Sequence, residues 1–330
     1  MKMSHTIAIT SRLFTLHPPA TDFLRANDCA IVERIADSLP EDELIDLLRD
    51  ADGLIAGLPK ITDRVLTNAP RLKVICRTGV GYDTVDVEAC TRHGVVVAIT
   101  PGINQDAVAD TTMTLLLALA RNLIPSHLGV QAGQWTRVVG VEAWRKTLGI
   151  IGFGRVGQGV AQRARGFEME VLVSDVVENT EAAARLGARF VPLEELLAKS
   201  DFVSLNAPLT PETHHIINAD TLRLMKPTAY LINTARGGLI DEIALAKALR
   251  EKQIAGAGLD VLSVEPPPTD HPLIGLDNVV LMPHAAGWSW ESIARTSQLA
   301  AQTMLDVCQG RKPVGVVNEE VYQAGHLKPL

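Results

Sequence analysis

The sequence predicts an α/β protein of two domains, each built on a parallel sheet, and two observations favour this class. Short, continuously apolar segments alternate with amphipathic helical stretches from end to end. Such segments are typical of parallel strands that helices cover on both faces. The chain of 330 residues also exceeds the size at which a single hydrophobic core usually stops growing.

The predicted strands form two groups along the chain. The first comprises TIAIT at 6–10, GLIAGL at 53–58, KVICR at 73–77 and GVVVAIT at 94–100. The second comprises TLGIIG at 147–152, EVLVSD at 170–175, DFVSLNA at 201–207, AYLINT at 229–234, GAGLDV at 256–261 and NVVLMP at 278–283. Each group contains enough strands to form one sheet.

The two junctions between the groups are predicted helices. The stretch 104–122 is apolar on nearly every side, so it must be buried between domains or between subunits. The stretch 289–310 is a helix with Ser289 as candidate N-cap and Gly310 at its end. The tail beyond it is too short for a domain and is expected to return to the first group.

This organisation predicts a discontinuous substrate domain of residues 1–103 plus 290–330, which encloses a nucleotide-binding domain of residues 104–289. Glycine turns follow a strand in both domains. Open α/β sheets bind ligands at the carboxyl ends of their strands, so we expect the ligands in an interdomain cleft.

Charge and cysteine content exclude several classes of protein. The net charge of -7 leaves no basic surplus for nucleic acid or an anionic membrane surface. The four cysteines are scattered without metal-ligand spacing, so we expect free thiols and no metal site. The N-terminus lacks a signal-peptide pattern, and the most apolar stretch, 113–120, is too short to span a bilayer. We therefore expect a cytoplasmic protein.

The strongest local motif is G-x-G-x-x-G in TLGIIGFGRVGQG, formed by Gly152, Gly154 and Gly157 after an apolar strand. The first glycine permits a tight turn, the second a close approach to a pyrophosphate, and the third close helix packing. The alternative is a tight turn without a ligand. The next strand ends in Asp175, whose carboxylate would accept bonds from ribose hydroxyls and repel a 2′-phosphate. Because no Arg or Lys follows directly, the pattern favours NAD over NADP on a Rossmann-type domain.

Three side chains that could carry chemistry each follow an apolar strand of the second group. They are Arg236, Glu265 and His284. Each one alone is most simply an ordinary loop residue. Parallel strands place their carboxyl ends at one edge of the sheet, so the coincidence indicates a site. An arginine fork can bind a carboxylate and a carbonyl oxygen. An imidazole exchanges protons near neutral pH, which suits His284 to acid/base work.

The sequence resembles the D-isomer-specific 2-hydroxyacid dehydrogenases over nearly its whole length. The matching stretches, in order, are RTGVGYDTVDV, TPGINQDAVADTTMTLLLALAR, TLGIIGFGRVG, NAPLTPETHHIIN, LINTARGGLIDE, GLDVLSVEP and PHAAG. The resemblance implies two Rossmann or flavodoxin-like domains and NAD-dependent hydride transfer. It implies that His284 is the acid/base, that Glu265 is its partner and that Arg236 clamps the substrate carboxylate and carbonyl.

The resemblance extends to binding residues and assembly. It implies cofactor contacts at Gly152, Gly154, Arg155, Val156, Gly157, Asp175, Ala207, Pro208, Thr213, Thr234, Ala235 and Asp260. It implies that Gly79, Val80 and Gly81 cradle the substrate carboxylate. It also implies a homodimer through the NAD-binding domain, where the helix 104–122 would expose a stripe formed by Met113, Leu116, Leu117 and Leu119.

Several alternatives stay open. Gly57 stands about where phosphoglycerate dehydrogenases carry a phosphate-binding arginine, and Lys60 is the nearest cation. This favours a small 2-keto acid such as glyoxylate or hydroxypyruvate over a phosphorylated substrate. A different class, an NAD-sensing corepressor-like protein, would need a partner-binding tail, and neither terminus is long or of low complexity. Trp288 and Trp290 fit a pocket wall or domain packing equally well.

Overall fold

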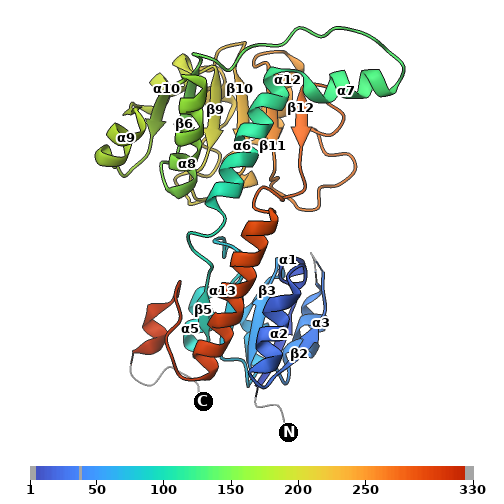
Figure 1. The fold of residues 1–330 in the computed structure, drawn as a ribbon, viewed down its shortest axis with the longest axis vertical. Helices are drawn as coiled ribbons and strands as arrows, with labels where there is room; N and C mark the ends of the chain where they lie inside the picture. Colours follow the sequence, from blue (N-terminus) through green and yellow to red (C-terminus); the bar gives the residue numbers. More distant parts are fainter. Residues whose placement is uncertain (1–4, 37–38, 324–330) are drawn as a thin grey trace. The chain divides into compact units, whose positions relative to one another are not determined.

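A computed structural model describes residues 5–36 and 39–323 and divides the chain into two compact units (Figure 1). Unit 1 consists of Met1–Asn104 with Trp288–Leu330, and unit 2 of Gln105–Gly287. The predicted ends of the first domain, residues 1–4 and 324–330, lie outside the described residues. Each unit is described by itself below.

Unit 1 contains a parallel sheet with the strand order β2-β1-β3-β4-β5 in its described part. The strands are β1 (His5–Ile9), β2 (Cys29–Glu33), β3 (Gly53–Ala56), β4 (Val74–Arg77) and β5 (Val96–Ala98). The strands β3, β4 and β5 are buried along their whole length, in agreement with their apolar sequences.

Helices cover both faces of this sheet. One core layer lies under α1 (Arg12–Thr15), α2 (Pro18–Ala26) and α13 (Trp290–Cys308). The other lies under α3 (Glu41–Leu48), α4 (Asp63–Thr67) and α5 (Val87–Arg92). A short 3-10 helix, η3 (Glu319–Tyr322), follows α13. Alternate residues of one strand enter opposite layers, because Ile7 packs in the first and Ala8 in the second.

Unit 2 is a wider parallel sheet, ordered β12-β11-β10-β9-β6-β7-β8. Its strands are β6 (Thr147–Ile151), β7 (Glu170–Ser174), β8 (Ala188–Phe190), β9 (Phe202–Leu205), β10 (Tyr230–Asn233), β11 (Gly256–Leu259) and β12 (Val279–Leu281). The chain starts at β6 in the middle, extends to one edge, and then continues from β9 to the other. The order therefore reverses between β6 and β9, where such sheets bind ligands.

The helices of unit 2 also form two layers. One core layer lies under α6 (Gln105–Ala120), α8 (Arg155–Ala164) and α9 (Thr180–Leu186). The other lies under α10 (Leu193–Lys199), α11 (Ala219–Leu222) and α12 (Glu242–Arg250). Helix α7 (Leu123–Gln131) and the short 3-10 helices η1 (Arg165–Phe167) and η2 (Gly237–Leu239) complete the unit.

The structure agrees with the predicted class and with two parallel sheets, but it adds two strands. The strands β2 and β8 lie at sheet edges and are partly exposed, so their sequences lack the continuous apolar run of a central strand. The predicted helix cap is present, because Ser289 Oγ accepts the N–H of Ser292 at the start of α13. Gly310 follows the helix with φ 74°.

One expectation was wrong: α6 presents no exposed apolar stripe. Met113, Leu116 and Leu119 are buried within a single chain, and Leu117 packs against the same core. The sheet approaches the helix closely, since a Cβ on Gly258 of β11 would lie 3.1 Å from Leu115 Cβ. Helix α8 covers another side, because Gly159 leaves room for Ala109. An all-apolar helix must be covered, but its sequence does not name the covering element.

The apolar surface lies instead on α7 and on the segment 132–144 that follows it. No residue of α7 is buried. Figure 1 shows α7 and this segment projecting from the body of unit 2. In the part of the chain that the structure describes, no single helix is long and apolar enough to cross a membrane; α6 and α7 reach that threshold only together, with a bend of 63° between them.

Candidate active site

The glycine turn after β6 has the close contacts that its sequence requires. Gly152 adopts φ +93°, and a Cβ there would lie 2.5 Å from the backbone N of Ala207. A Cβ on Gly157 would lie 2.2 Å from Gly152 O, so only glycine lets α8 pack this tightly. A Cβ on Gly154, the N-cap of α8, would meet nothing within 4 Å. The turn is therefore packed on the protein side and open at the helix N-terminus, where a pyrophosphate fits.

Asp175 directly follows β7 beside this turn. Its Oδ2 accepts the N–H of Phe153 at 2.5 Å, and its Oδ1 accepts that of Val177 at 3.0 Å. The carboxylate therefore joins the glycine turn to the end of the next strand. Arg155 is exposed and Val156 half-buried at the start of α8.

The loop after β9 lies against the glycine turn through Ala207. Its shape is set by Thr213, whose Oγ1 donates to Pro208 O at 2.7 Å and accepts the N–H of Thr210 at 2.8 Å. The sites predicted in this loop thus lie at the switch point between β6 and β9, together with Gly152.

Arg236 lies just beyond β10 in a loop fixed by the buried Asn233. The Asn233 amide accepts the N–H of Ala235 at 2.9 Å and donates to Arg236 O at 2.8 Å. The guanidinium donates from Nη1 to Ala235 O at 2.7 Å. Thr234 is buried and shares a 2.8 Å hydroxyl contact with Thr112 of α6. Asn233 therefore fixes the backbone at Arg236, and the contact with Ala235 O orients the guanidinium.

Glu265 and His284 form a hydrogen-bonded pair. His284 Nδ1 lies 2.6 Å from Glu265 Oε2, and Oε1 accepts the N–H of Leu262 at 3.0 Å. Burial opposes ionisation of Glu265, but the hydrogen bond and charge of His284, the Leu262 N–H and the charge of Arg236 together lower its pKa below the ordinary value. The ionised carboxylate can only accept, so Nδ1 donates to it and Nε2 is the ring nitrogen outside this pair.

Asp260 fixes the turn that carries His284. The turn needs support because His284 has φ 53°, in the left-handed region. Asp260 accepts the N–H groups of Ala285 at 2.8 Å and Ala286 at 2.9 Å, and its carbonyl accepts that of His284 at 2.7 Å. Burial raises the pKa of the Asp260 carboxyl, and the Ala285 and Ala286 N–H groups partly offset this. Both carboxylate oxygens of Asp260 are therefore used to hold the turn that carries His284.

The remaining predicted residues belong to unit 1 or to the start of α13. Gly79, Val80 and Gly81 follow β4, where Thr100 N donates to Gly79 O at 2.9 Å and Arg77 Nε to Gly81 O at 3.0 Å. Val80 is exposed, and a Cβ on Gly79 would meet nothing within 4 Å. Trp288 and Trp290 are both exposed in unit 1 as well.

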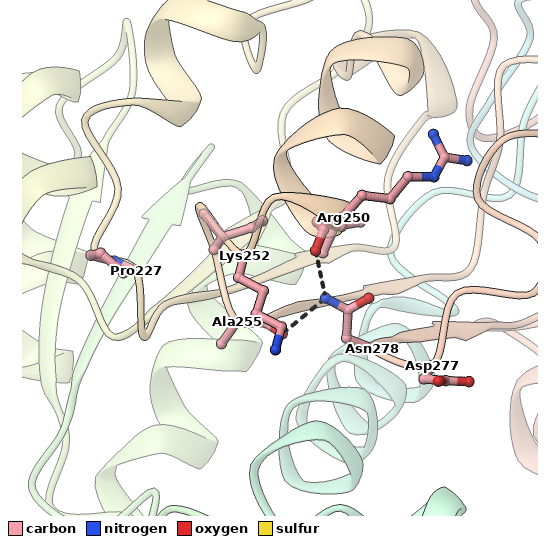
Figure 2. A pocket seen from close by; sticks show the side chains of 8 residues that line it. Pro227, Arg250, Lys252, Ala255, Asp277 and Asn278 are labelled. Atoms are coloured by element: carbon pink, nitrogen blue, oxygen red, sulfur yellow. Dashed lines mark hydrogen bonds between the residues drawn. The ribbon is translucent and has the colours of Figure 1, made fainter.

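A cavity of about 540 Å³ in unit 2 lies away from these residues (Figure 2). Its lining residues precede strands: Pro227 lies before β10, Ala255 before β11, and Asp277 and Asn278 before β12. The Asn278 amide closes one side by donating to the carbonyls of Leu249 and Ala255. The cavity is thus at the amino ends of the strands, whereas Arg236, Glu265 and His284 follow carboxyl ends.

Sequence reasoning missed three polar residues of this region. Thr112 contacts Thr234 from α6, and Glu242 and His271 pair with each other at 3.1 Å below the Glu265 loop. Glu242 follows the motif ARGG and His271 follows the triple proline, so both lay next to stretches already singled out. Across residues 5–36 and 39–323, no three metal-ligating side chains gather into a candidate metal site.

The glycine turn and the aspartate after the second strand of unit 2 are typical of a dinucleotide-binding protein, and the hydrogen-bonded pair of His284 and Glu265 follows the carboxyl ends of strands in the same unit. The family model for the D-isomer specific 2-hydroxyacid dehydrogenase NAD binding domain matches residues 113–286.

The chain is similar over most of its length to known proteins and solved structures. The glyoxylate reductase of Korarchaeum cryptofilum is 43% identical, covering 84% of this chain and 86% of its own. That of Pyrococcus furiosus is also 43% identical, covering 86% and 87%. A Thermus thermophilus crystal structure is 38% identical with a TM-score of 0.87, covering 94% and 99%. Aquifex aeolicus D-lactate dehydrogenase, solved with NAD and lactic acid, is 30% identical with a TM-score of 0.80, covering 92% and 96%.

The chain belongs to the D-isomer specific 2-hydroxyacid dehydrogenase family. It is an NAD-dependent oxidoreductase that acts on a small 2-hydroxy or 2-keto acid.

Proposed function

We propose that this enzyme reduces small 2-keto acids, with glyoxylate or hydroxypyruvate as substrate, and that Arg236, Glu265 and His284 carry the chemistry. The 2.6 Å bond between His284 and Glu265 is the observation on which the proposal rests. We also propose unit 2 as the NAD-binding domain and unit 1 as the substrate domain. The two curated glyoxylate reductases named above support the choice of substrate.

His284 and Glu265 together manage one proton. When bound, NADH supplies a hydride to the carbonyl carbon of the keto acid. His284 donates the Nε2 proton to the carbonyl oxygen, so the product is the 2-hydroxy acid and the imidazole becomes neutral. Glu265 holds Nδ1–H, fixes the ring orientation and favours the protonated imidazolium. In the reverse direction, neutral His284 removes the hydroxyl proton.

Arg236 binds the other end of the reacting group. Its planar guanidinium neutralises the substrate carboxylate and polarises the carbonyl, which stabilises the developing negative charge on oxygen. The backbone N–H groups at Val80 and Gly81 add a second carboxylate contact, and the open backbone at Gly79 supports that role. The cofactor contacts in this proposal are the residues Gly152, Gly154, Arg155, Val156, Gly157, Asp175, Ala207, Pro208, Thr213, Thr234, Ala235 and Asp260.

A panel of keto acids tests the substrate. NADH oxidation is measured with glyoxylate, hydroxypyruvate, pyruvate, 2-ketobutyrate and phosphohydroxypyruvate under the same conditions. We expect the highest kcat/KM with glyoxylate or hydroxypyruvate. Gly57 is half-buried against Thr10, and Lys60 is exposed, so neither provides the arginine that a substrate phosphate would require. A clear preference for phosphohydroxypyruvate contradicts the proposed substrate, and no turnover with any keto acid favours an NAD-sensing role.

Asp175 is expected to set the preference for NAD over NADP. The change Asp175→Asn keeps an acceptor for a backbone N–H but removes the charge that repels a 2′-phosphate. We expect the ratio of kcat/KM for NADH to that for NADPH to fall about tenfold, because charge repulsion near a protein surface has a magnitude of about 1–4 kcal/mol. Glu178→Gln, an exposed change on the same loop, is the control. A wild-type enzyme that prefers NADPH contradicts this role.

We further propose that the protein is a homodimer formed by unit 2, through α7 and the segment 132–144. Leu128, Trp135 and Val139 are 59%, 82% and 92% exposed, and Val130 and Trp144 are each 49% exposed. Monomers rarely leave a large apolar patch in water, and a twofold contact is the commonest way to bury one. This surface replaces the α6 stripe, which is covered within one chain.

Sedimentation of dilute protein tests the dimer. An obligate apolar interface typically buries more than about 2,000 Å², so the wild type should remain dimeric at nanomolar concentration. The double change Leu128→Asp with Val139→Asp is expected to yield a 35.5 kDa monomer. Val314→Asp, at a residue of unit 1 that is 65% exposed, should leave the dimer intact. A monomeric wild type contradicts the proposal.

We propose a cytoplasmic location, because the cysteines carry free thiols. All four cysteines are free and buried. Burial raises the pKa of Cys76 and of Cys308 to about 12, so both thiols stay protonated and unreactive. Free buried thiols are typical of a reducing compartment.

A further inference from the structure

Two polar residues outside the proposed catalytic set lie at the base of the loop that carries Glu265. Glu242, the first residue of α12, accepts the N–H of Ser263 through Oε1 at 2.8 Å. Its Oε2 lies 3.1 Å from His271 Nε2. One carboxylate therefore holds the chain on both sides of Glu265. Both side chains are nearly enclosed, with 12% of Glu242 and 7% of His271 exposed.

His271 is fixed from its other side. Its Nδ1 accepts the N–H of Leu273 at 3.4 Å, which leaves the ring proton on Nε2 to be donated to Glu242. Its backbone N–H donates to Pro268 O at 3.1 Å, and its carbonyl accepts the N–H of Ile274 at 2.9 Å. The ring is thus an anchored end point for the Glu265 loop.

The loop between these two points has little apolar packing of its own. Ser263, Val264 and Pro266 are exposed, and the bond from Leu262 N–H to Glu265 lies within the loop. Segments with few buried contacts depend on polar ties for a single position. The Arg236 loop touches this segment directly, because a Cβ on Gly237 would lie 2.0 Å from the carbonyl carbon of Leu262. Glu242 follows the glycines of the Arg236 loop in the sequence and accepts the N–H of Ser263 in the Glu265 loop, so it connects the two loops.

We propose that Glu242 and His271 are positioning residues that hold Glu265 in hydrogen-bonding range of His284. This inference rests on the proposed function, in which the Glu265 carboxylate orients the acid/base histidine. Neither residue contacts the reacting atoms. Their loss would let the Glu265 loop move, lengthen the bond to His284 and weaken the effect of the carboxylate on the imidazolium.

The pH dependence of turnover distinguishes positioning from mere stability. The pKa of Glu265 is lowered, so its charge is present throughout neutral pH and favours protonated His284. Keto-acid reduction needs that proton, so Glu265→Gln should move the alkaline limb of the pH profile of kcat to lower pH by about one unit. Glu242→Ala should move the limb in the same direction and lower kcat at neutral pH about tenfold, with the Kd for NADH unchanged.

A double-mutant cycle completes the test. In the Glu265→Gln background, Glu242→Ala is expected to lower kcat less than about twofold, because the carboxylate it positions is gone. Glu242→Gln should recover part of the activity, since its amide oxygen can still accept the Ser263 N–H, whereas its amide nitrogen cannot accept from His271 Nε2. His271→Gln provides a second entry to the same cycle if Glu242→Ala does not fold. The matched control is Asp201→Ala, which removes a part-buried carboxylate that accepts the N–H of Thr147 and pairs with Lys226.

Each outcome decides a different claim. Independent, multiplicative losses in the cycle, or a Glu242→Ala enzyme that behaves like Asp201→Ala with an unmoved pH profile, overturn the positioning role alone. A Glu265→Gln enzyme with normal turnover and a normal pH profile overturns the proposed function of Glu265, and with it the role of the residues that hold it.

Discussion

His284→Asn is expected to lower kcat by about 10²–10⁴-fold, the usual contribution of a positioned general acid. Asparagine is the suitable replacement because His284 has φ 53°, and asparagine tolerates the left-handed region better than alanine. The Kd for NADH should change little, since the glycine turn after β6 does not involve His284. Single-turnover reduction of a keto acid and fluorescence titration with NADH measure the two effects separately.

His215→Asn is the matched control for this change. His215 belongs to the same unit and adopts φ 52°, so it carries the same backbone cost without a place in the proposed chemistry. Its turnover should stay within about twofold of the wild type, because His215 has no part in the proposed proton transfer. Near-normal turnover of His284→Asn would remove His284 from the mechanism.

Arg236→Lys is expected to lower kcat/KM for the keto acid by about 10²-fold, although the charge is preserved. The planar fork can bind a carboxylate and a carbonyl oxygen together, whereas an ammonium group presents a point charge on a flexible stem. The contact of Nη1 with Ala235 O sets the direction of the guanidinium plane, and lysine has no such plane to orient. Loss of one preorganised donor to a developing oxyanion commonly has this magnitude.

Arg223→Lys controls for the substitution itself. Arg223 is an exposed residue of unit 2 that pairs with Asp220 across one helical turn. Such surface pairs contribute little, so its kinetics should match the wild type. If Arg236→Lys raises KM and leaves kcat unchanged, Arg236 binds the substrate without stabilising the transition state, and its proposed effect on the carbonyl is wrong.

Much of the fold could be predicted from the sequence, because strands and turns leave patterns in consecutive residues. Central strands such as β9 and β10 read as continuous apolar runs, since both faces are buried. The edge strands β2 and β8 gave no such signal, because a half-exposed strand has a mixed sequence. In the glycine turn, Gly152 adopts φ +93° and Gly157 makes a close contact that leaves no room for a Cβ. Each of these positions requires glycine, so the motif alone was enough to predict the turn.

The candidate site was less completely predictable, for a physical reason. Arg236, Glu265 and His284 could be placed together because parallel strands end at one sheet edge. Which polar groups hold them could not be foreseen, since the Glu242–His271 pair joins residues far apart in the chain that packing alone brings together. The commitment of Asp260 to the N–H groups after His284 likewise appears only in three dimensions.

By itself, the sequence determined the fold class, the nucleotide turn and the family, because backbone conformation and motif order are written in consecutive residues. Only the tertiary structure decided what covers each apolar surface. Helix α6 is apolar on nearly every side, yet its own sheet and α8 bury it, while α7 remains exposed. The hydrophobic effect is non-directional, so an apolar side chain records that it must leave water but not which neighbour receives it.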